Sequence, residues 1–391
     1  MCGLPFCGII HYSKVVWKED LSDMHMKKRE KDKISLETRG YKRWNVITTG
    51  GVVLCLLVII IATIYIDPFF HYHGPVDGIA YELNIDNSRH QNDGIVKHFE
   101  YDAVITGNSM AMNFKNSLLD ELFGTRSIKV ADHGARYKET NETLEKAFRK
   151  NPDIKLVLRV LDLSMLIFDK DDMRGGIDYP TYMTNDKVLD DVYYLLNKDV
   201  LLKDTLDAVL TTLSGGKSTS FDEYGRFHEY FTFGKEAVLR SYTLGEKKEA
   251  KQLTEEDKKI IYENLEQNVL ALAREHPDTE FYLYFPPYSI GYWDELNQNG
   301  EIERMIDAEQ YAIELLLKQP NIKLYCFFTN FDMVCDLDNY MDYHHYGEWI
   351  NDDMLRWMHA GEYLLTEENY MTHLDSMRRF YMAFDYEALH E

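Results

Sequence analysis

Residues that could carry out acyl chemistry stand at two distant points of the chain. Ser109 lies in the sequence GNSM, and Asp342 and His345 lie in DYHH. A serine hydroxyl becomes a good nucleophile when a histidine removes its proton and a carboxylate orients that histidine. Residues three apart share one side of a helical turn, so Asp342 could hold one ring nitrogen of His345 while the other faces Ser109. The spacing predicts Ser109 as nucleophile, His345 as base and Asp342 as the orienting carboxylate.

Two alternatives remain open at this point. His344 is a competing base, because it also follows Asp342 closely. Asp342 and His345 could instead be surface residues that cap the next helix.

Five short apolar segments are expected to be the strands that position these residues. They are 101–107, 127–132, 154–163, 279–285 and 321–329. Near-continuous apolar strands are typical of a sheet buried on both faces. Helical patterns lie between them at 137–150, 254–275 and 302–318, the second opened by a capping sequence that starts at Thr254. This alternation predicts an α/β domain with a three-layer α/β/α arrangement around a five-stranded parallel sheet.

The carboxyl ends of the predicted strands share one edge of the sheet, where ligands bind in such folds. Polar or aromatic residues follow all five of the strands there. Besides the three residues above, we expect a substrate to contact Asn108, Tyr288, Asn330 and His344.

The alternation of predicted strands and helices stops at 165–253, and we interpret this segment as an insertion. It contains an apolar stretch at 188–213 that predicts one helix, and a loop at 175–182 that could supply a cleft wall. Long insertions often shape a substrate cleft, although this one could also be a passive excursion packed on the sheet.

The layout of motifs resembles that of the SGNH/GDSL hydrolases over roughly 101–358. The resemblance is a serine in a Gly-x-Ser turn after the first strand, a glycine after the second, and D-x-x-H after the last. It implies a flavodoxin-like sheet, catalysis by Ser109, Asp342 and His345, and an oxyanion hole formed by the amides of Ser109 and Gly134. The sequence departs from the family in having GNS for GDS and LDLSML where a Gly-x-Asn-Asp block is usual, so a third oxyanion donor is unassigned.

The first third of the sequence predicts one membrane-spanning helix at 44–66, where 23 successive residues carry no charge. Residues 1–43 would be a basic cytoplasmic tail and everything after Asp67 would lie outside, because positive charge stays in the cytoplasm. We divide the rest into a juxtamembrane segment at 67–100, the SGNH-like domain at 101–365 and a C-terminal extension at 366–391. An anchored, outward-facing SGNH domain is also similar to the D-alanyl-transfer protein of teichoic-acid modification and to alginate O-acetylation proteins.

Composition excludes several other classes of protein. The formal charge is −23, which argues against a nucleic-acid binder. Only 5 cysteines occur, without a repeated CxxC, so a disulfide scaffold and a zinc ribbon are also excluded. Cys326 and Cys335 could pair, or Cys326 could be a buried free thiol. We expect no cofactor and no metal.

The sequence therefore predicts an anchored, extracytoplasmic serine esterase or O-acyltransferase acting on acylated glycans of the cell envelope. A membrane acyltransferase is an expected partner. The alternative is a non-catalytic binding or assembly subunit of an envelope polysaccharide or teichoic-acid pathway.

Overall fold

The computed structural model describes residues 9–174, 180–185 and 187–390, with side chains from residue 22 on. It divides into two compact units, Met1–Ala62 and Thr63–Glu391. The predicted tail at 1–43 is thus described from residue 9, and residues 175–179 of the predicted cleft-wall loop lie outside the described residues.

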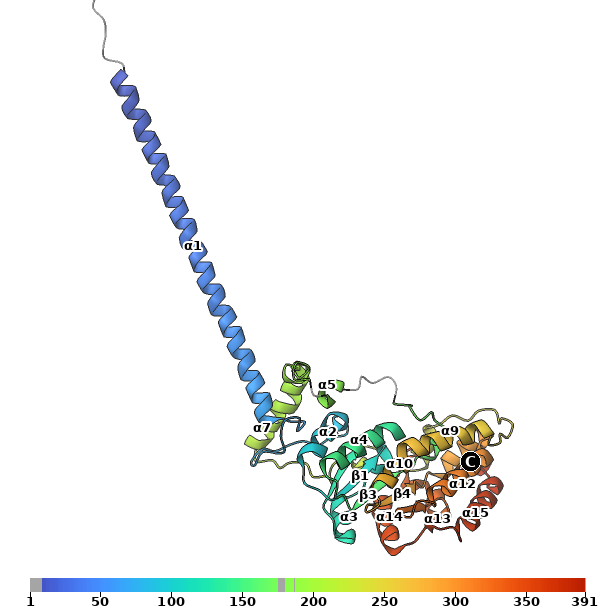
Figure 1. The fold of residues 1–391 in the computed structure, drawn as a ribbon. Coiled ribbons are helices and arrows are strands. Elements are labelled where there is room, and N and C mark those ends of the chain that lie inside the picture. The colour runs from blue at the N-terminus through green and yellow to red at the C-terminus, as the bar shows by residue number, and fades with distance from the viewer. Residues whose placement is uncertain (1–8, 175–179, 186, 391) are drawn as a thin grey trace, which may run out of the picture. The chain divides into compact units, whose positions relative to one another are not determined.

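The chain begins with one long helix, α1 (Ile9–Ile66), drawn in blue in Figure 1. Its part Ser22–Ile66 contains a stretch long and apolar enough to cross a membrane, and the side chains of that stretch are almost all exposed. A signal sequence near the N-terminus would share these properties. The predicted span at 44–66 is the C-terminal part of this helix.

The folded unit after α1 is built on a single six-stranded sheet. Its strands are β1 (Ala103–Gly107), β2 (Ser127–Ala131), β3 (Leu156–Val160), β4 (Glu280–Phe285), β5 (Ile322–Cys326) and β6 (Leu364–Leu365). The order across the sheet is β2-β1-β3-β4-β5-β6. All residues of the first three strands are buried, as their unbroken apolar sequences predict.

The prediction of five parallel strands was wrong in one respect. Neighbouring strands from β2 to β5 pair in parallel, but β6 pairs antiparallel with β5 and is a sixth strand. A strand of two residues is too short to have a periodic pattern, so the sequence does not predict it.

Helices connect the strands. The helices predicted at 137–150 and 302–318 are present, whereas the one predicted over 254–275 is divided by a π-helical segment, Glu266–Leu270. The main helices are α2 (Ser88–His98), α3 (Asn116–Phe123), α4 (Tyr137–Lys150), α9 (Glu255–Leu265), α10 (Ala271–Glu275), α11 (Ile290–Asn299), α12 (Ile302–Leu316), α13 (Phe331–Cys335), α14 (Glu348–Ala360) and α15 (Tyr370–Ala383). Thr254 caps α9 as expected, accepting a hydrogen bond from the Asp257 amide. Helix α2 packs on α4 and β2, and α12 packs on α9 and α15. The three-layer arrangement itself stays a prediction.

The insertion between β3 and β4 is helical but irregular. Its elements are α5 (Thr181–Thr184), α6 (Val192–Leu195), a π-helical turn (Val200–Thr205), α7 (Leu206–Leu213), a 3-10 turn (Phe227–Glu229) and α8 (Lys235–Arg240). The single helix predicted over 188–213 is therefore broken. The break falls where the Asn197 side chain accepts a hydrogen bond from the Asp199 amide, which competes with helical bonding.

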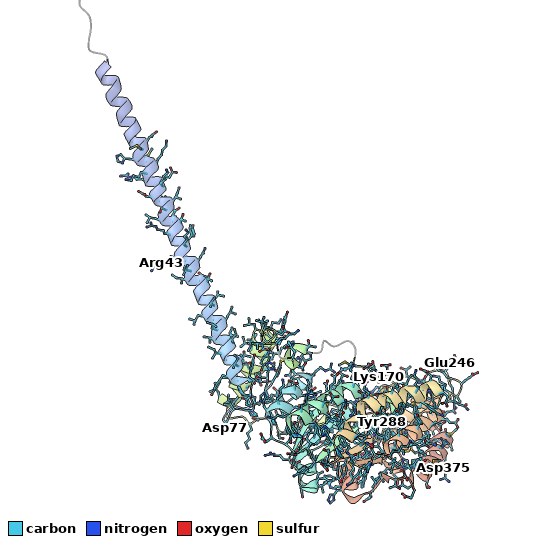
Figure 2. The ribbon with its side chains drawn as sticks, in the orientation of Figure 1. Arg43, Asp77, Lys170, Glu246, Tyr288 and Asp375 are labelled. Carbon is cyan, nitrogen blue, oxygen red and sulfur yellow. The ribbon has the colours of Figure 1, made fainter. Side chains whose placement is uncertain are left out.

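The interior of the folded unit is apolar and continuous around the sheet. Figure 2 shows Tyr288 inside it and Glu246 and Asp375 at its surface. Cys326 is fully buried, and both Cys326 and Cys335 are free thiols, so the pairing considered above does not form.

Candidate active site

The turn after β1 gives Ser109 its position. Strand β1 ends at Gly107, whose φ of +138° is open only to glycine, and an added Cβ would lie 2.2 Å from Cγ1 of Val160. Asn108 then caps a short 3-10 turn, because its Oδ1 accepts a hydrogen bond of 3.0 Å from the Met110 amide. Ser109 is the first residue of this turn and sits at the carboxyl end of the strand.

A buried lysine supports the chain just beyond Ser109. Lys129 of β2 is fully buried, and its Nζ donates to the carbonyl oxygens of Met112, Phe114 and Tyr224 at 2.6, 2.9 and 2.9 Å. Burial lowers the pKa of Lys129 to about 7. Three carbonyls converging on one amine fix the loop that follows the serine.

The three residues of the predicted triad form a hydrogen-bonded chain. Oγ of Ser109 lies 2.7 Å from Nε2 of His345, and Nδ1 of His345 lies 2.7 Å from Oδ2 of Asp342. The other carboxylate oxygen accepts the amides of His344 and His345 at 2.8 and 2.7 Å. Burial alone would raise the pKa of Asp342, but these hydrogen bonds and the nearby imidazole lower it to about 2. The carboxylate is therefore ionised at neutral pH and can hold the imidazole with a proton on Nδ1.

The loop that carries His345 is fixed on both sides. Tyr340 and Tyr346 form an antiparallel bridge, and the Met341 amide donates to the His345 carbonyl at 3.0 Å. The Tyr340 hydroxyl donates to the carbonyl of Pro287 at 2.8 Å. Asn113, four residues after Ser109, donates from Nδ2 to the Tyr346 carbonyl at 3.1 Å. This last bond ties the two halves of the candidate site together.

The competing base, His344, is enclosed by aromatic rings, and it is His345 that lies within hydrogen-bond distance of Ser109. The His344 ring packs against Tyr288, Tyr292 and Tyr343, with ring centroids 4.8, 5.1 and 4.0 Å apart. Burial lowers the pKa of His344 to about 4. The structure thus brings His345, rather than His344, to Ser109.

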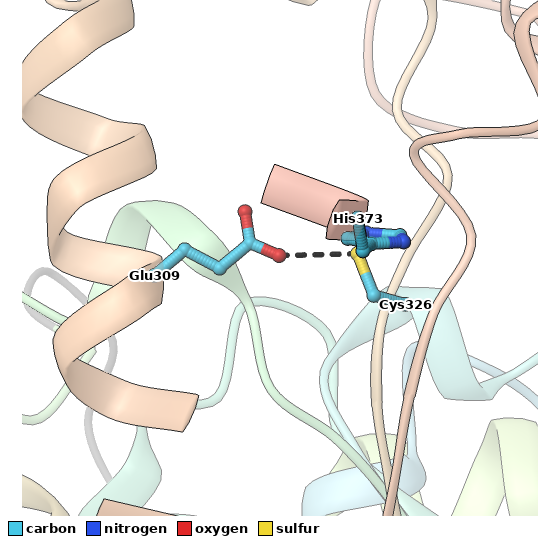
Figure 3. Close-up of side chains that lie close together, drawn as sticks. All are labelled: Glu309, Cys326 and His373. Carbon is cyan, nitrogen blue, oxygen red and sulfur yellow. Dashed lines mark hydrogen bonds between the residues drawn. The ribbon is translucent and has the colours of Figure 1, made fainter. Parts of the chain in front are cut away.

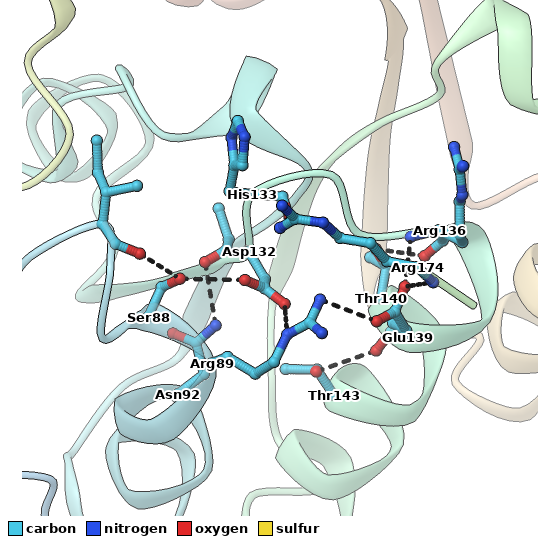
Figure 4. Close-up of polar contacts among 12 residues, drawn as sticks. Ser88, Arg89, Asn92, Asp132, His133, Arg136, Glu139, Thr140, Thr143 and Arg174 are labelled. Carbon is cyan, nitrogen blue, oxygen red and sulfur yellow. Dashed lines mark hydrogen bonds and ion pairs between the residues drawn. The ribbon is translucent and has the colours of Figure 1, made fainter. Parts of the chain in front are cut away.

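Gly134 lies in the loop after β2, and Figure 4 shows the polar network that holds this loop. Asp132 accepts hydrogen bonds from Ser88 and Arg89 at 3.1 and 2.6 Å. Glu139 accepts hydrogen bonds at 2.9 Å from the amides of Arg136 and Arg174. Because the residues before and after Gly134 are anchored in this way, its backbone has a fixed orientation.

The loop also lies within electrostatic reach of the triad. The Arg174 guanidinium donates to the His133 carbonyl, and its side chain lies where a Cβ on Gly134 would fall. Burial, together with the charges of Arg174 and His345, lowers the pKa of His133.

Two backbone amides are available as oxyanion donors. Gly134 has a φ of +68°, and within the described part of the chain neither its amide nor that of Ser109 donates to a protein acceptor. Asp162, which follows β3 where the SGNH resemblance leads one to expect an Asn, accepts a hydrogen bond of 2.8 Å with its Oδ2 from Nδ2 of Asn108. Asp162 also accepts from the amide and hydroxyl of Ser164, so it stabilises the turn as an acceptor.

The four residues expected to contact substrate lie in different surroundings. The Asn108 amide group is engaged with Met110 and Asp162, and Tyr288 is completely buried. Asn330 caps α13 by accepting from the Met333 amide. Together with the enclosed His344, these residues build the frame of the site, and their contact with a substrate stays a prediction.

The sequence did not identify two further neighbours of the triad. The Phe227 ring from the insertion stands edge-on to the His345 imidazole, with centroids 5.6 Å apart, and no local pattern marks it. Lys129 could have been noticed in the sequence, because it is a charged residue within the apolar strand SIKVA. A charge inside such a strand indicates a buried, fully bonded group.

No family model matches the chain, and no curated protein does. Among solved structures, one that matches is described as "The structure of a putative platelet activating factor from Streptococcus pneumonia". It shares 13% identity, the match covers 71% of this chain and 91% of that one, and the TM-score is 0.35. A likeness this distant carries no argument about activity.

Proposed function

We propose that the protein is a membrane-anchored serine hydrolase or O-acyltransferase of the SGNH type that acts on acyl esters of envelope or exported glycans. The observation that carries the proposal is the hydrogen-bonded chain from Ser109 through His345 to Asp342. A serine, an imidazole and an ionised carboxylate in this order are the parts that acyl transfer needs.

The proposed reaction runs in two halves. Ser109 Oγ attacks the ester carbonyl while its proton passes to Nε2 of His345, and Asp342 stabilises the imidazolium that results. The tetrahedral oxyanion accepts hydrogen bonds from the amides of Ser109 and Gly134. His345 then protonates the leaving alcohol, and the acyl group stays on Ser109 as an ester.

The second half decides between the two activities. Water, deprotonated by His345, releases the acid in an esterase, whereas a sugar hydroxyl takes the acyl group in a transferase. Both acceptors use the same side chains. A groove of about 650 Å³, lined among others by Asp86, Gly225 and Arg226, adjoins the Phe227 turn and is the proposed acceptor region.

The location outside the cytoplasm rests on the charge around α1. Arg39, Lys42 and Arg43 stand directly before the apolar stretch and Asp67 directly after it, so the positive-inside rule favours a folded unit outside the cytoplasm.

The insertion supports a position at the membrane surface. It exposes large apolar side chains, among them Leu189, Tyr193, Leu202, Leu210 and Leu213. The same insertion is tied to the chain directly after α1, because the Tyr194 hydroxyl donates to Asp67 at 2.8 Å. Large apolar side chains exposed within one segment suit the lipid interface, which is the partner that we propose for them.

One feature favours the non-catalytic alternative. Asp162 cannot donate a hydrogen bond as a carboxylate, so the oxyanion would rest on two backbone donors. Losing one donor typically costs ~10²–10³ in rate. A slow enzyme and an inactive subunit therefore differ in whether Ser109 reacts at all.

The test is active-site labelling of the full chain in detergent micelles with a fluorophosphonate probe. The parent is expected to label, and Ser109→Ala and His345→Ala should not. Ser214→Ala, which changes an exposed serine at the end of α7 whose hydroxyl donates to the Thr211 carbonyl, is the matched control and should label like the parent. A correctly folded parent that resists the probe would overturn the enzymatic proposal in favour of the subunit. The orientation is tested separately by protease treatment of intact cells, which should digest the folded unit and spare the N-terminal tail.

A further inference from the structure

A second cluster of reactive side chains lies away from the candidate active site. It joins Glu309 of α12, Cys326 at the end of β5 and His373 of α15, as Figure 3 shows. Each residue offers one ligand atom, and these atoms all lie within 4.8 Å of one another. In a tetrahedral zinc shell, ligand atoms stand ~3.3–3.8 Å apart, so small side-chain adjustments would close the shell.

The cluster has more hydrogen-bonding capacity than the protein uses. The Cys326 thiol donates to Oε1 of Glu309 at 3.1 Å, and Thr329 Oγ1 lies 3.4 Å from Nδ1 of His373. Within the described part of the chain, Oε2 of Glu309 and Nε2 of His373 are buried without a partner. Glu309 and Cys326 are both 0% exposed. Buried polar atoms are nearly always satisfied, so two orphans in one cluster indicate a missing ligand.

Charge balance identifies the kind of ligand that would fit. An isolated charge is costly at a site where two of the three side chains are completely buried. A divalent cation with one thiolate, one carboxylate and a neutral imidazole has no net charge, which is what such a site requires.

His373 is the member of the cluster that borders a surface groove. A groove of about 500 Å³ is lined by His373 together with Thr329, Tyr363 and Asn369. An ion could enter along this groove, and a water molecule could occupy the fourth position. Sulfur, nitrogen and oxygen ligands in one tetrahedral set are typical of zinc.

We propose that Glu309, Cys326 and His373 form a zinc-binding site that fastens α15 to the last parallel strand of the sheet. Binding requires the thiolate, so the proton of the Cys326 thiol passes to solvent, and the Glu309 carboxylate and the neutral His373 imidazole complete the ligand set. The three ligands come from α12, β5 and α15, so the ion would hold the C-terminal extension in place. The absence of a spacing motif explains why the sequence predicted no metal.

The first test measures metal in the full chain, purified in detergent with an affinity tag that contains no histidine. The parent is expected to retain about one zinc ion per chain, since three protein ligands define a single site. The Cys326→Ser variant should lose it. Cys335→Ser is the matched control, because Cys335 is a free thiol outside the cluster, and it should keep the metal.

A second measurement covers the case in which Cys326→Ser fails to fold. The parent, stripped with chelator, is titrated with Co²⁺, which should give a thiolate-to-cobalt charge-transfer band and the intense visible bands of a four-coordinate ion. His373→Gln, at the side of the cluster that borders the groove, should weaken Co²⁺ binding at least tenfold while the near-ultraviolet circular dichroism stays that of the parent. A parent without zinc and without the charge-transfer band would overturn the proposal. Equal spectra for the parent and His373→Gln would do the same.

Discussion

The Ser109 hydroxyl and Nε2 of His345 lie 2.7 Å apart, although 236 residues separate them in the chain. The contact depends on two loops that are held independently. Lys129 fixes the loop after the serine, and the Tyr340–Tyr346 bridge fixes the loop of the histidine. Activity should therefore respond to changes in either support as well as to changes in the triad.

Replacing Asp342 by Asn should inactivate the protein without unfolding it. Asn can present its NH₂ group to Nδ1, which favours the tautomer whose Nε2 carries a proton and cannot accept one from Ser109. A comparable change in a serine protease costs ~10⁴ in rate, and we expect a fall of ~10³–10⁴ in ester hydrolysis. Hydrolysis of p-nitrophenyl acetate measures it, with the neighbouring exposed Asp338→Asn as control. Equal rates for the two variants would remove Asp342 from the mechanism.

Substitutions of the two adjacent histidines should have clearly different effects on fluorophosphonate labelling. His345→Phe removes the base and should abolish fluorophosphonate labelling. His344→Phe keeps an aromatic ring among Tyr288, Tyr292 and Tyr343 and should change the labelling rate by less than about threefold, since it touches no reacting atom. Loss of labelling in His344→Phe with a native circular dichroism spectrum would argue against the assignment.

Gly134→Ala should slow the reaction more than it destabilises the fold. The added methyl group strains a backbone at φ +68° and meets Arg174 at 3.1 Å, so the amide is displaced. Because a lost oxyanion donor costs ~10²–10³, a displaced one should lower the rate about 10- to 100-fold. Gly124→Ala is the control, since Gly124 has a φ of +67° in open space. Both variants should lose about 1 kcal/mol of unfolding free energy. Only Gly134→Ala should also lose activity. If both variants lost activity equally, the Gly134 amide would not be an oxyanion donor.

Lys129 should make stability depend on pH. Its pKa is about 7 in the folded protein and 10.5 for a solvent-exposed lysine, so the unfolded chain binds more protons between these values. A group of this kind makes the unfolding free energy rise with pH in that window. Between pH 7 and 9 the rise should be about 2 kcal/mol from this residue.

Urea unfolding of the parent and of Lys129→Met at both pH values isolates the contribution of Lys129. The variant should be less stable overall, because three buried carbonyls lose their donor. It should also lack the rise with pH. If the unfolding free energy rose equally with pH in the parent and in Lys129→Met, Lys129 would have an ordinary pKa in the folded protein.

The sequence predicted the elements that form by local pattern. The helix at 137–150 has the expected bounds, and the first five strands fall within the expected segments, because apolar runs and caps act locally. It also placed Ser109 and D-x-x-H at one sheet edge, since parallel strands bring their carboxyl ends together.

What the sequence missed depends on contacts between distant residues. Phe227 reaches His345 from an insertion whose path no pattern specifies. Glu309, Cys326 and His373 meet only because α12 and α15 pack together beside β5. The sequence predicted that Asn108 contacts substrate, because it follows the end of a strand. In the structure its side chain donates a hydrogen bond to Asp162, which comes from a distant part of the chain.

The short strand β6 also has a consequence for neighbouring chains. An open strand edge is a template for pairing with another copy of the chain. By pairing antiparallel with β5, residues 364–365 cover that edge with the chain's own backbone. A chain that ends before residue 364 would keep all residues of the triad and yet present β5 to its neighbours. We expect such a chain to self-associate before it loses catalytic activity.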